Sequence, residues 1–362
     1  MGCLLPTHVL GRIAINSTDK NTRALAIQNI EITTSLLSAR IGFDETMRAQ
    51  RQLKRAQRLA RGKGLFQLTG AEPQKHRTIY TSGNSTRTPG TPVRQEGGPA
   101  LQDPEVDESY GFMGQTFDFF WNAFGRNSLD DAGAPLNGSV HYSVSYDNAL
   151  WNGKQMIYGD GDDKQFVRFT KSADVIGHEL THGVTQHESG LIYYGEPGAL
   201  NESLSDVFGS MVKQYINNQD VNQADWLIGA GLFTPSVNGQ AIRSLKAPGT
   251  AYGPDPILGH DDQPSNMQNY VHTLSDNGGV HINSGIPNNA FYRAATYIGG
   301  YSWDRTGLIW YKAMTSPQLS KVGKFQQFAQ LTVAVAQQLF PAANAAEPHA
   351  VQQAWNEVGI AV

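Results

Sequence analysis

Hydrophobic and polar positions follow two different periods along this chain. Between residues 138 and 169 the period is close to two, with Asn-Gly and Gly-Asp breaks, as in antiparallel strands joined by turns. Elsewhere apolar residues recur every three or four positions, which predicts helices. The predicted helices cover residues 18–40, 107–124, 173–187, 201–215, 287–298, 304–313, 324–339 and 348–358. The pattern therefore indicates a strand-rich segment followed by a mostly helical second half.

The first hundred residues differ in character from the rest. Residues 64–106 are rich in Gly, Pro, Thr and Gln, so we expect a linker or an extended arm that lies on another surface. Residues 1–63 contain 11 Lys and Arg against 4 Asp and Glu, which leaves 17 of the 28 basic and 28 of the 32 acidic residues to the remainder. The charge balance is thus +7 before residue 64 and −11 after it.

The basic excess is concentrated in residues 48–63, which contain no acid. Three interpretations of this segment stay open. The segment is a solvated, protease-sensitive connector, or it binds nucleic acid or an anionic membrane, or it is attracted to the negative remainder of the chain.

Composition is that of an ordinary globular protein, with 40% hydrophobic and 17% charged residues. No run of 18 apolar residues occurs, so we expect no membrane span. The start, Met1 to Pro6, lacks a basic region and a sustained apolar run, so we expect no signal peptide and a chain that is cytoplasmic at synthesis. Any secretion would use a route that the sequence does not reveal. The single cysteine, Cys3, excludes an intramolecular disulfide.

The segment with the clearest chemistry is His178-Glu179-Leu180-Thr181-His182. Four residues make slightly more than one helical turn, so both imidazoles project from one face of the helix predicted over residues 173–187. Neutral imidazole nitrogen suits Zn²⁺, and Glu179 lies beside such a metal rather than on it. The sequence therefore indicates a metal site on this helix.

Two further segments follow this motif. Asn201-Glu202-Ser203-Leu204-Ser205-Asp206 offers a third metal ligand in Glu202 and another carboxylate, Asp206, one helical turn later. Asp276-Asn277-Gly278-Gly279-Val280-His281 places an acid and a histidine at a glycine-rich loop. In this order and spacing the three segments resemble the thermolysin family of zinc metalloendopeptidases, the gluzincins.

The resemblance extends from Asp107 to Ala313 and includes the segments Tyr110–Asp118 and Asn148–Gly153. Within the family, the chain looks most like the protealysin-like group, which carries a short prosegment. The resemblance implies an α+β, thermolysin-like fold of two lobes. An antiparallel β-rich N-terminal lobe and a helical C-terminal lobe are expected to flank the active-site helix, behind an N-terminal prosegment.

Such a precursor divides into four parts. We expect a prosegment over residues 1–63, a linker or extended arm over 64–106, the β-rich catalytic lobe with the H-E-x-x-H helix over 107–189, and the helical lobe over 190–362. Maturation is expected to cut the chain between Asp44 and Gln74.

The implied activity is hydrolysis of internal peptide bonds on the amino side of bulky hydrophobic residues. We expect one Zn²⁺ per chain, protein or peptide substrates, the chain's own prosegment bound in cis, a monomer, and no nucleic acid. Two alternatives of other classes stay open. One is a catalytically silent peptide-binding relative, and the other is a membrane or nucleic-acid binder that acts through residues 48–63.

The resemblance assigns roles at the metal site. His178, His182 and Glu202 are expected to be the ligands, which leaves a fourth position for water, as catalytic zinc sites do. Bound water becomes a usable nucleophile near neutral pH, and Glu179 is expected to act as its general base. Asp206 is expected to accept a hydrogen bond from a ligand imidazole and so fix its tautomer.

His281 and Tyr193 match the family's donors to the oxyanion of the tetrahedral intermediate, where donors lower the barrier. Asp276 is expected to orient the ring of His281 and to favour its protonated form. These three residues complete the expected catalytic set together with Glu179.

Substrate contacts are also implied. A peptide is expected to add as an extra strand at Asn148, Ala149 and Trp151, and Arg243 is expected to bind a substrate carbonyl. The apolar pocket for the residue after the scissile bond is expected to consist of Phe166, Phe169, Val175, Ile228, Leu232 and Ile242. Its two phenylalanines are expected to narrow the pocket and to favour Leu over Phe.

The N-terminal motif is a less complete match. Cys3 and Pro6 resemble the Pro-Pro-x inhibitory motif of protealysin-type prosegments, but Thr7 stands where the second proline would be. A thiolate near a zinc site can displace the catalytic water. The alternative is an ordinary free thiol near a terminus.

The paired calcium site of thermolysin is expected to be absent. Asp174 and Asp225 match two of its acids, but Lys213 and Ala230 stand where two glutamates would be. Calcium needs several oxygen ligands, and these replacements remove two carboxylates and add a positive charge. The ammonium of Lys213 is expected to pair with Asp174 instead.

Overall fold

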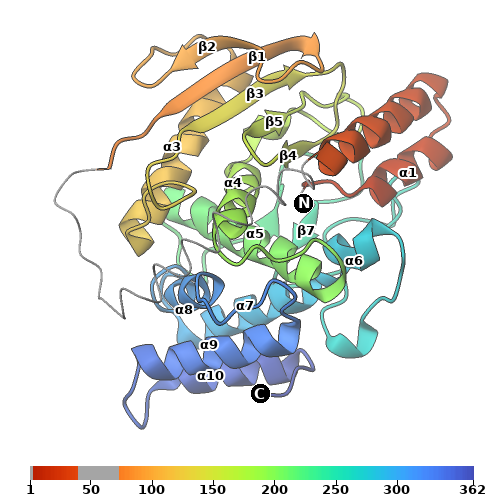
Figure 1. Cartoon of the computed structure of the whole chain (residues 1–362). Coiled ribbons are helices and arrows are strands. Elements are labelled where there is room, and N and C mark those ends of the chain that lie inside the picture. The colour runs from red at the N-terminus through yellow and green to blue at the C-terminus, as the bar shows by residue number, and fades with distance from the viewer. Residues whose placement is uncertain (1–2, 40–72) are drawn as a thin grey trace.

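The computed structural model describes residues 3–39 and 73–362 of the chain, and it consists of two lobes (Figure 1). The strand-rich lobe contains α3 Pro104–Phe124 and the strands β1 Arg77–Ser85, β2 Thr91–Gln95, β3 Leu136–Tyr142, β4 Ala149–Trp151 and β5 Met156–Tyr158. The helical lobe contains α7 Gly285–Ile298, α8 Arg305–Met314, α9 Phe325–Leu339 and α10 Ala346–Glu357. Between them lie α4 Ala173–His187, α5 Gly195–Ile216, the short strands β6 Leu227–Ile228 and β7 Arg243–Ser244, and α6 Asp276–Asn283.

The α+β organisation in two lobes is confirmed, and the helix expected over 173–187 has those bounds in the structure. The other predicted helices are present with ends shifted by a few residues. The largest shift is at α5, which begins six residues before the expected start at residue 201. Periodicity thus located these helices, but it did not indicate α1 or α6.

The sheet corrects one expectation. Its strand order is β2-β1-β3-β5-β4, and the pairs β1–β3 and β3–β5 are parallel, whereas β1–β2 and β4–β5 are antiparallel. The lobe is therefore a mixed sheet and not antiparallel throughout. Alternation of polar and apolar residues along a strand shows which face is buried, but not the direction of the neighbouring strand. β1 and β3 are parallel, with α3 in the connection between them.

The expectation of a linker or arm over residues 64–106 was wrong for its central part. Residues 77–95 form β1 and β2, and Ile79 is fully buried in the core. β2 is one of the two edge strands of the sheet, the position in a sheet where a proline such as Pro92 is tolerated. The Gly, Pro and Thr content that suggested a linker is thus the composition of an edge hairpin.

The N-terminal segment is folded and lies against the strand-rich lobe and the region between the lobes. It consists of α1 Thr7–Asn16, which the sequence analysis did not predict, and a helix over residues 20–39. Asn29 Nδ2 donates to Ser145 O (3.0 Å), and Arg12 Nη1 donates to His260 O (2.9 Å). The apolar contacts of the second helix include Ile32, Leu36 and Leu37 against a cluster of Cys3, Tyr142, Tyr146, Leu150 and Ile157. Ala26 and Ile30 of the same helix pack on the main hydrophobic cluster.

In the ion pairs between the N-terminal segment and the rest of the chain, the positive charge is not always on the segment. Arg12 forms an ion pair with Asp262, but Asp19 of the N-terminal segment pairs with Lys164 of the strand-rich lobe. The basic segment 48–63 and the maturation region between residues 44 and 74 lie outside the described residues, apart from residues 73 and 74. Within the part that is described, packing and hydrogen bonds hold the segment in place more than net charge does.

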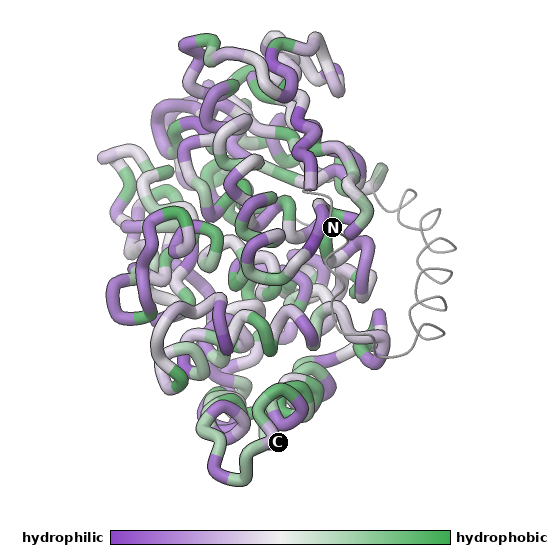
Figure 2. Tube along the Cα trace, turned by 90° about the vertical axis from the view of Figure 1, so that its left-hand side faces the viewer, coloured by the Kyte–Doolittle hydropathy of each residue, from purple (hydrophilic) through white to green (hydrophobic). Residues whose placement is uncertain are grey.

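Hydrophobic and hydrophilic positions are interspersed along the trace (Figure 2), and most of the apolar ones gather in one cluster that spans both lobes. Among residues 3–39 and 73–362, no helix is long and apolar enough to cross a membrane.

Two glycines set the distance between α4 and α5. A Cβ built on Gly177 would lie 3.1 Å from Gly209 Cα, and a Cβ on Gly209 would lie 2.4 Å from Asp174 O and 3.0 Å from His178 N. Those last two neighbours are backbone atoms, which cannot rotate out of the way. The two helices therefore touch backbone to backbone, which brings the side chains of residues 178, 202 and 206 together.

We expect Gly209→Ala to lower the free energy of unfolding by about 1–3 kcal/mol, because the added methyl overpacks this contact. The matched control is Gly111→Ala in α3, where a Cβ meets nothing within 4 Å and alanine is the better helix former. Urea unfolding of both variants measures the difference. Equal stability of the two variants would contradict the role given to Gly209.

Candidate active site

The two histidines of α4 and Glu202 of α5 meet in the interior, and all three are buried. His178 Nε2 and His182 Nε2 lie 3.1 Å apart. Glu202 Oε2 lies 3.4 Å from His178 Nε2, and Glu202 Oε1 lies 3.4 Å from His182 Nε2. The three side chains that the sequence analysis placed on one metal ion are therefore brought together.

The far side of each imidazole is held by a hydrogen bond. His178 Nδ1 lies 2.8 Å from Asp206 Oδ1, as expected. His182 Nδ1 lies 2.9 Å from Asn201 Oδ1 and 3.0 Å from Ser205 Oγ. Asn201 and Ser205 both stand in a motif identified in the sequence, but neither was expected to have a role. They are four residues apart, about one helical turn, so both lie on the face of α5 that contacts His182.

These contacts test whether the residues fit a zinc ion. Partners at both Nδ1 atoms leave the two Nε2 atoms facing the same small space. Among the described residues, Glu202 Oε2 accepts no hydrogen bond although it is buried. Ligand atoms at about 2.0–2.1 Å from a tetrahedral zinc stand roughly 3.3 Å apart, which is close to the observed separations of 3.1 and 3.4 Å. The donor set therefore fits zinc.

Asp206 joins this group to the helical lobe. It receives Arg243 Nη2 at Oδ1, and Arg243 Nε and Asn288 Nδ2 at Oδ2, each at 2.8 Å. Burial opposes ionisation of Asp206, but the neighbouring Arg243 guanidinium and His178 hold the pKa of this carboxyl well below its usual range. Asp206 therefore stays charged, and its hydrogen bond to His178 does not depend on pH in the neutral range.

Glu179 lies beside the histidines without joining their contacts with Glu202. Its Oε1 is 3.9 Å from His178 Nε2, and its Oε2 accepts a hydrogen bond from Trp151 N at 2.8 Å. Glu179 also belongs to a group with His178 and His182 whose ligand-type atoms all lie within 4.8 Å of one another. The carboxylate is thus close enough to reach a molecule bound at the histidines.

A sharp turn at the start of α6 positions His281 in the site. Asp276, Asn277, Gly278 and Gly279 all have positive φ, between 51° and 82°. This turn brings Asp276 Oδ1 to 2.6 Å from His281 Nδ1, while Asp276 Oδ2 accepts from His281 N at 2.8 Å. Glycine adopts such backbone angles freely, which explains the two consecutive glycines.

The protonation of His281 follows from its neighbours. Burial opposes a charged ring, but the carboxylates of Asp276 and Glu202 outweigh burial and raise the pKa of His281 well above its ordinary value. Burial and Glu202 also raise the pKa of the Tyr193 phenol, whose oxygen lies 3.1 Å from His281 Nε2. Near neutral pH both side chains therefore carry the proton that a hydrogen-bond donor needs.

The N-terminal segment occupies the edge of β4 next to these donors. Cys3 forms an antiparallel bridge with Leu150, and Leu4 N donates to Ala149 O at 3.0 Å. Asn148 binds the next residue twice, because its Oδ1 accepts from Leu5 N and its Nδ2 donates to Leu5 O, both at 2.9 Å. The strand-edge segment expected to hold a peptide thus holds one from its own chain.

The segment also contacts two groups outside β4. Arg243 Nη1 donates to Leu4 O at 2.8 Å, and His281 Nε2 lies 2.8 Å from Cys3 O. Cys3 Sγ is buried and lies 4.0 Å from His281 Nε2. The sequence analysis singled out Cys3 and Pro6 but missed Leu4 and Leu5, since contacts across more than 140 residues leave no local signal.

The six residues expected to form the apolar pocket are all buried in the main hydrophobic cluster, and Leu4 belongs to the same cluster. The rings of Phe166 and Phe169 lie 5.7 Å apart, centroid to centroid. Trp151 Nε1 donates to Gln186 Oε1 at 2.8 Å, which fixes its indole against α4. All six residues therefore belong to the hydrophobic core that spans both lobes.

Lys213 takes the place that the sequence analysis gave it. Its Nζ lies 2.8 Å from both Asp174 Oδ2 and Asp225 Oδ1, and donates to Leu227 O at 2.6 Å. Burial opposes the charged amine, but Asp174 and Asp225 outweigh burial and raise the pKa of Lys213. The predicted ion pair between Lys213 and Asp174 is confirmed.

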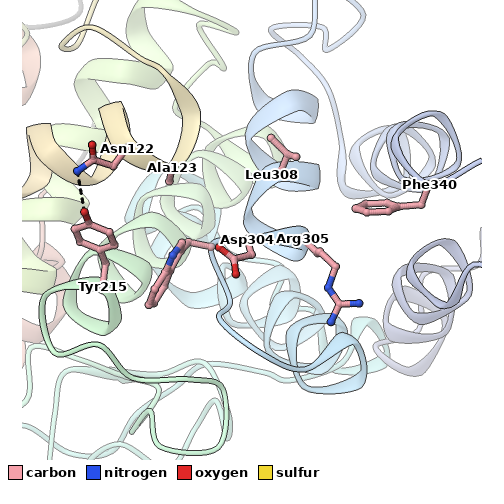
Figure 3. A pocket seen from close by; sticks show the side chains of 8 residues that line it. Asn122, Ala123, Tyr215, Asp304, Arg305, Leu308 and Phe340 are labelled. Atoms are coloured by element: carbon pink, nitrogen blue, oxygen red, sulfur yellow. Dashed lines mark hydrogen bonds between the residues drawn. The ribbon is translucent and has the colours of Figure 1, made fainter. Parts of the chain in front are cut away.

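A separate cavity of about 390 Å³ lies where α3, α5 and α8 approach Phe340 at the end of α9 (Figure 3). Its lining includes Asp304 and Arg305, and Asn122 Nδ2 donates to Tyr215 OH at 2.8 Å. The lining contains no histidine and no residue of the metal cluster, so this cavity is separate from the site on α4 and α5.

Comparisons with known proteins agree with this geometry. The chain matches the thermolysin metallopeptidase catalytic domain over residues 22–186 and the thermolysin metallopeptidase alpha-helical domain over residues 189–360. It is 46% identical over 359 residues to an extracellular metalloprotease of Pectobacterium carotovorum subsp. carotovorum, covering 99% of this chain and 96% of that protein. It is 42% identical over 268 residues to bacillolysin of Bacillus cereus, covering 72% of this chain and 44% of that protein.

A solved structure is similar over its whole length. The precursor of protealysin, a metalloproteinase from Serratia proteamaculans, superposes with a TM-score of 0.86 at 46% identity, and the match covers 100% of both chains. The two matching family models, the sequence identities and the histidine–glutamate cluster all indicate the same family. This chain belongs to the thermolysin family of zinc-dependent metallopeptidases.

Proposed function

We propose that this metallopeptidase hydrolyses peptide bonds at one zinc ion held by His178, His182 and Glu202. When bound there, zinc lowers the pKa of a water ligand and polarises the substrate carbonyl. The observation that supports this assignment is the convergence of two imidazole nitrogens and one carboxylate at separations of 3.1 and 3.4 Å, with Asp206 behind His178.

The chain's own groups divide the remaining work. Glu179 accepts the proton of the attacking water and passes it to the departing amine. His281 and Tyr193, both protonated near neutral pH, donate to the oxygen that becomes negative in the tetrahedral intermediate. Asp276 holds the ring of His281 in the orientation that this requires.

Substrate binding uses the groups that hold the N-terminal segment. A peptide pairs with the edge of β4, where Asn148 and Ala149 bind its backbone and Arg243 binds a carbonyl. The side chain after the scissile bond enters the apolar region of Phe166, Phe169, Val175, Ile228, Leu232 and Ile242. Protein and peptide substrates with large apolar residues at this position are therefore preferred.

The N-terminal segment acts as an inhibitor in cis, so the chain is a precursor. Residues 3–5 cover the β4 edge that a substrate needs, and α1 and the helix over residues 20–39 anchor them to the strand-rich lobe and to the region between the lobes. Its removal by a cut between residues 44 and 74 frees this edge. Since the Pectobacterium relative is an extracellular metalloprotease, we place the mature enzyme outside the cell.

The two alternatives gain no support. A silent peptide-binding relative would not need the full set of catalytic side chains that converge here, and the binder acting through residues 48–63 rests on a segment outside the described residues. We propose that the active enzyme is a monomer.

Replacement of Glu179 by alanine tests the function. We expect Glu179→Ala to retain zinc and to lose hydrolysis of a generic protein such as casein by about 10²–10⁴-fold or more, because the general base is gone while the ligands remain. Zinc is measured by elemental analysis of the dialysed protein. Gln337→Ala, at an exposed position of α9, is the control with normal activity. Loss of zinc from Glu179→Ala would show that Glu179 is a ligand and not a base.

A series of peptides that differ only in the residue after the scissile bond tests the preference. We expect kcat/KM to be about ten- to a hundredfold higher for leucine than for alanine, because burial of the larger side chain stabilises the bound peptide by roughly 1.5–3 kcal/mol. We expect leucine to be preferred over phenylalanine as well. A cleavage profile dominated by charged residues at this position contradicts the assignment.

We also propose that the enzyme lacks the paired calcium site, since the ammonium of Lys213 lies at Asp174 and Asp225. A calcium-selective chelator should leave the melting temperature unchanged, whereas a zinc-selective chelator should abolish activity. Lys213→Met should destabilise the protein by about 3–5 kcal/mol with or without calcium, because it leaves the buried Asp174 carboxylate unpaired. A large fall in melting temperature with the calcium chelator, or calcium bound at Asp174, would contradict this.

A further inference from the structure

The hydrogen bonds to residues 3–5 have an order along the chain. The carbonyl of Cys3 meets His281, the amide of Leu4 meets Ala149, the carbonyl of Leu4 meets Arg243, and both backbone groups of Leu5 meet Asn148. All five contacts measure between 2.8 and 3.0 Å. The segment is therefore bound in one fixed register.

This register is the one that a substrate would adopt. The carbonyl that receives the oxyanion donor His281 belongs to the residue before the scissile bond, so that residue is Cys3. The next amide, that of Leu4, is the leaving nitrogen, and the next carbonyl is the one that Arg243 binds. The segment runs in the same direction as a substrate, because reversing it would exchange amides and carbonyls at every contact.

The side chain at the following position also fits. Leu4 is fully buried and belongs to the same apolar cluster as Phe169, Val175 and Leu232. Leucine is the residue that the narrowed apolar region is expected to prefer after the scissile bond. The backbone contacts identify the bond, and the buried leucine that follows it has the side chain that the enzyme is expected to prefer there.

We propose that the Cys3–Leu4 peptide bond is a cleavage site of the enzyme itself, so that the N-terminal segment is a bound substrate as well as an inhibitor. A water molecule adds to the carbonyl carbon of Cys3, the bond from this carbon to Leu4 N breaks, and the proton lost by the water passes through Glu179 to Leu4 N. The products are a carboxylate at Cys3 and a chain that begins with the amino group of Leu4.

This cut differs from the maturation cut between residues 44 and 74. It leaves α1 and the helix over residues 20–39 attached to the enzyme, but it separates Cys3 O, the contact of His281, from the rest of the segment. The inference rests on the catalytic roles given above, and the experiment below separates its failure from theirs.

The full-length chain is prepared with a chelator, and its mass is followed after one equivalent of zinc is added. We expect loss of residues 1–3 and a new N-terminus at Leu4, with a first-order rate that does not change with protein concentration. Zinc-loaded Glu179→Ala should stay intact. Leu4→Asp should slow the cut by about ten- to a hundredfold or more, because a charged side chain replaces a buried leucine. Ile15→Asp, the same change at an exposed position of α1, should be cut like the original chain.

A synthetic peptide of residues 1–8 supplies the second measurement. Mature enzyme should cut it between Cys3 and Leu4 and not between Leu4 and Leu5, although both bonds precede a leucine. Casein is digested in parallel. Casein hydrolysis with an uncut Cys3–Leu4 bond, or a cut before Leu5, overturns the inference and leaves the proposed function standing. Failure to digest casein overturns both.

Discussion

The site depends on one buried carboxylate, that of Asp206. It is fully buried, and its two oxygens accept hydrogen bonds from His178, Arg243 and Asn288, which come from α4, β7 and α7. A buried charge is costly unless it is paired and hydrogen-bonded, so Asp206 requires all three elements to be in place at once. The close contact of α4 and α5 at Gly209 brings Asp206 within reach of His178. The contact between α4 and α5 and the hydrogen bonds of the Asp206 carboxylate thus require the same placement of His178.

Arg243 connects this charge to the peptide. Its Nε and Nη2 neutralise Asp206, and its Nη1 remains directed at Leu4 O. A planar guanidinium can serve both because its donors are fixed in a fork, which a lysine could not reproduce. The group that stabilises the metal-side carboxylate therefore also aligns the bound peptide.

The sequence predicted the parts of the structure that have a local signal. The helix of His178 and His182 has its predicted bounds, and Glu202, Asp206 and His281 lie where their motifs implied. Strand direction was not predictable, because alternation is the same in parallel and antiparallel pairs, and the edge hairpin of residues 77–95 was hidden by its proline and glycine content. Leu4 and Leu5 were missed because their partners are distant in sequence and their own side chains show only that they are apolar.

The N-terminal segment contacts the site mainly through its backbone. Asn148, Ala149, Arg243 and His281 bind backbone atoms, so they would hold many sequences equally well. Discrimination between sequences is left to the side chains, such as the fully buried Leu4, and to whatever else holds the segment in place. For the N-terminal segment, α1 and the helix over residues 20–39 add contacts of their own, among them the hydrogen bonds to His260 and Ser145. An ordinary three-residue peptide lacks these contacts. The two helices therefore hold the segment to the enzyme, whereas the backbone contacts of residues 3–5 set its register.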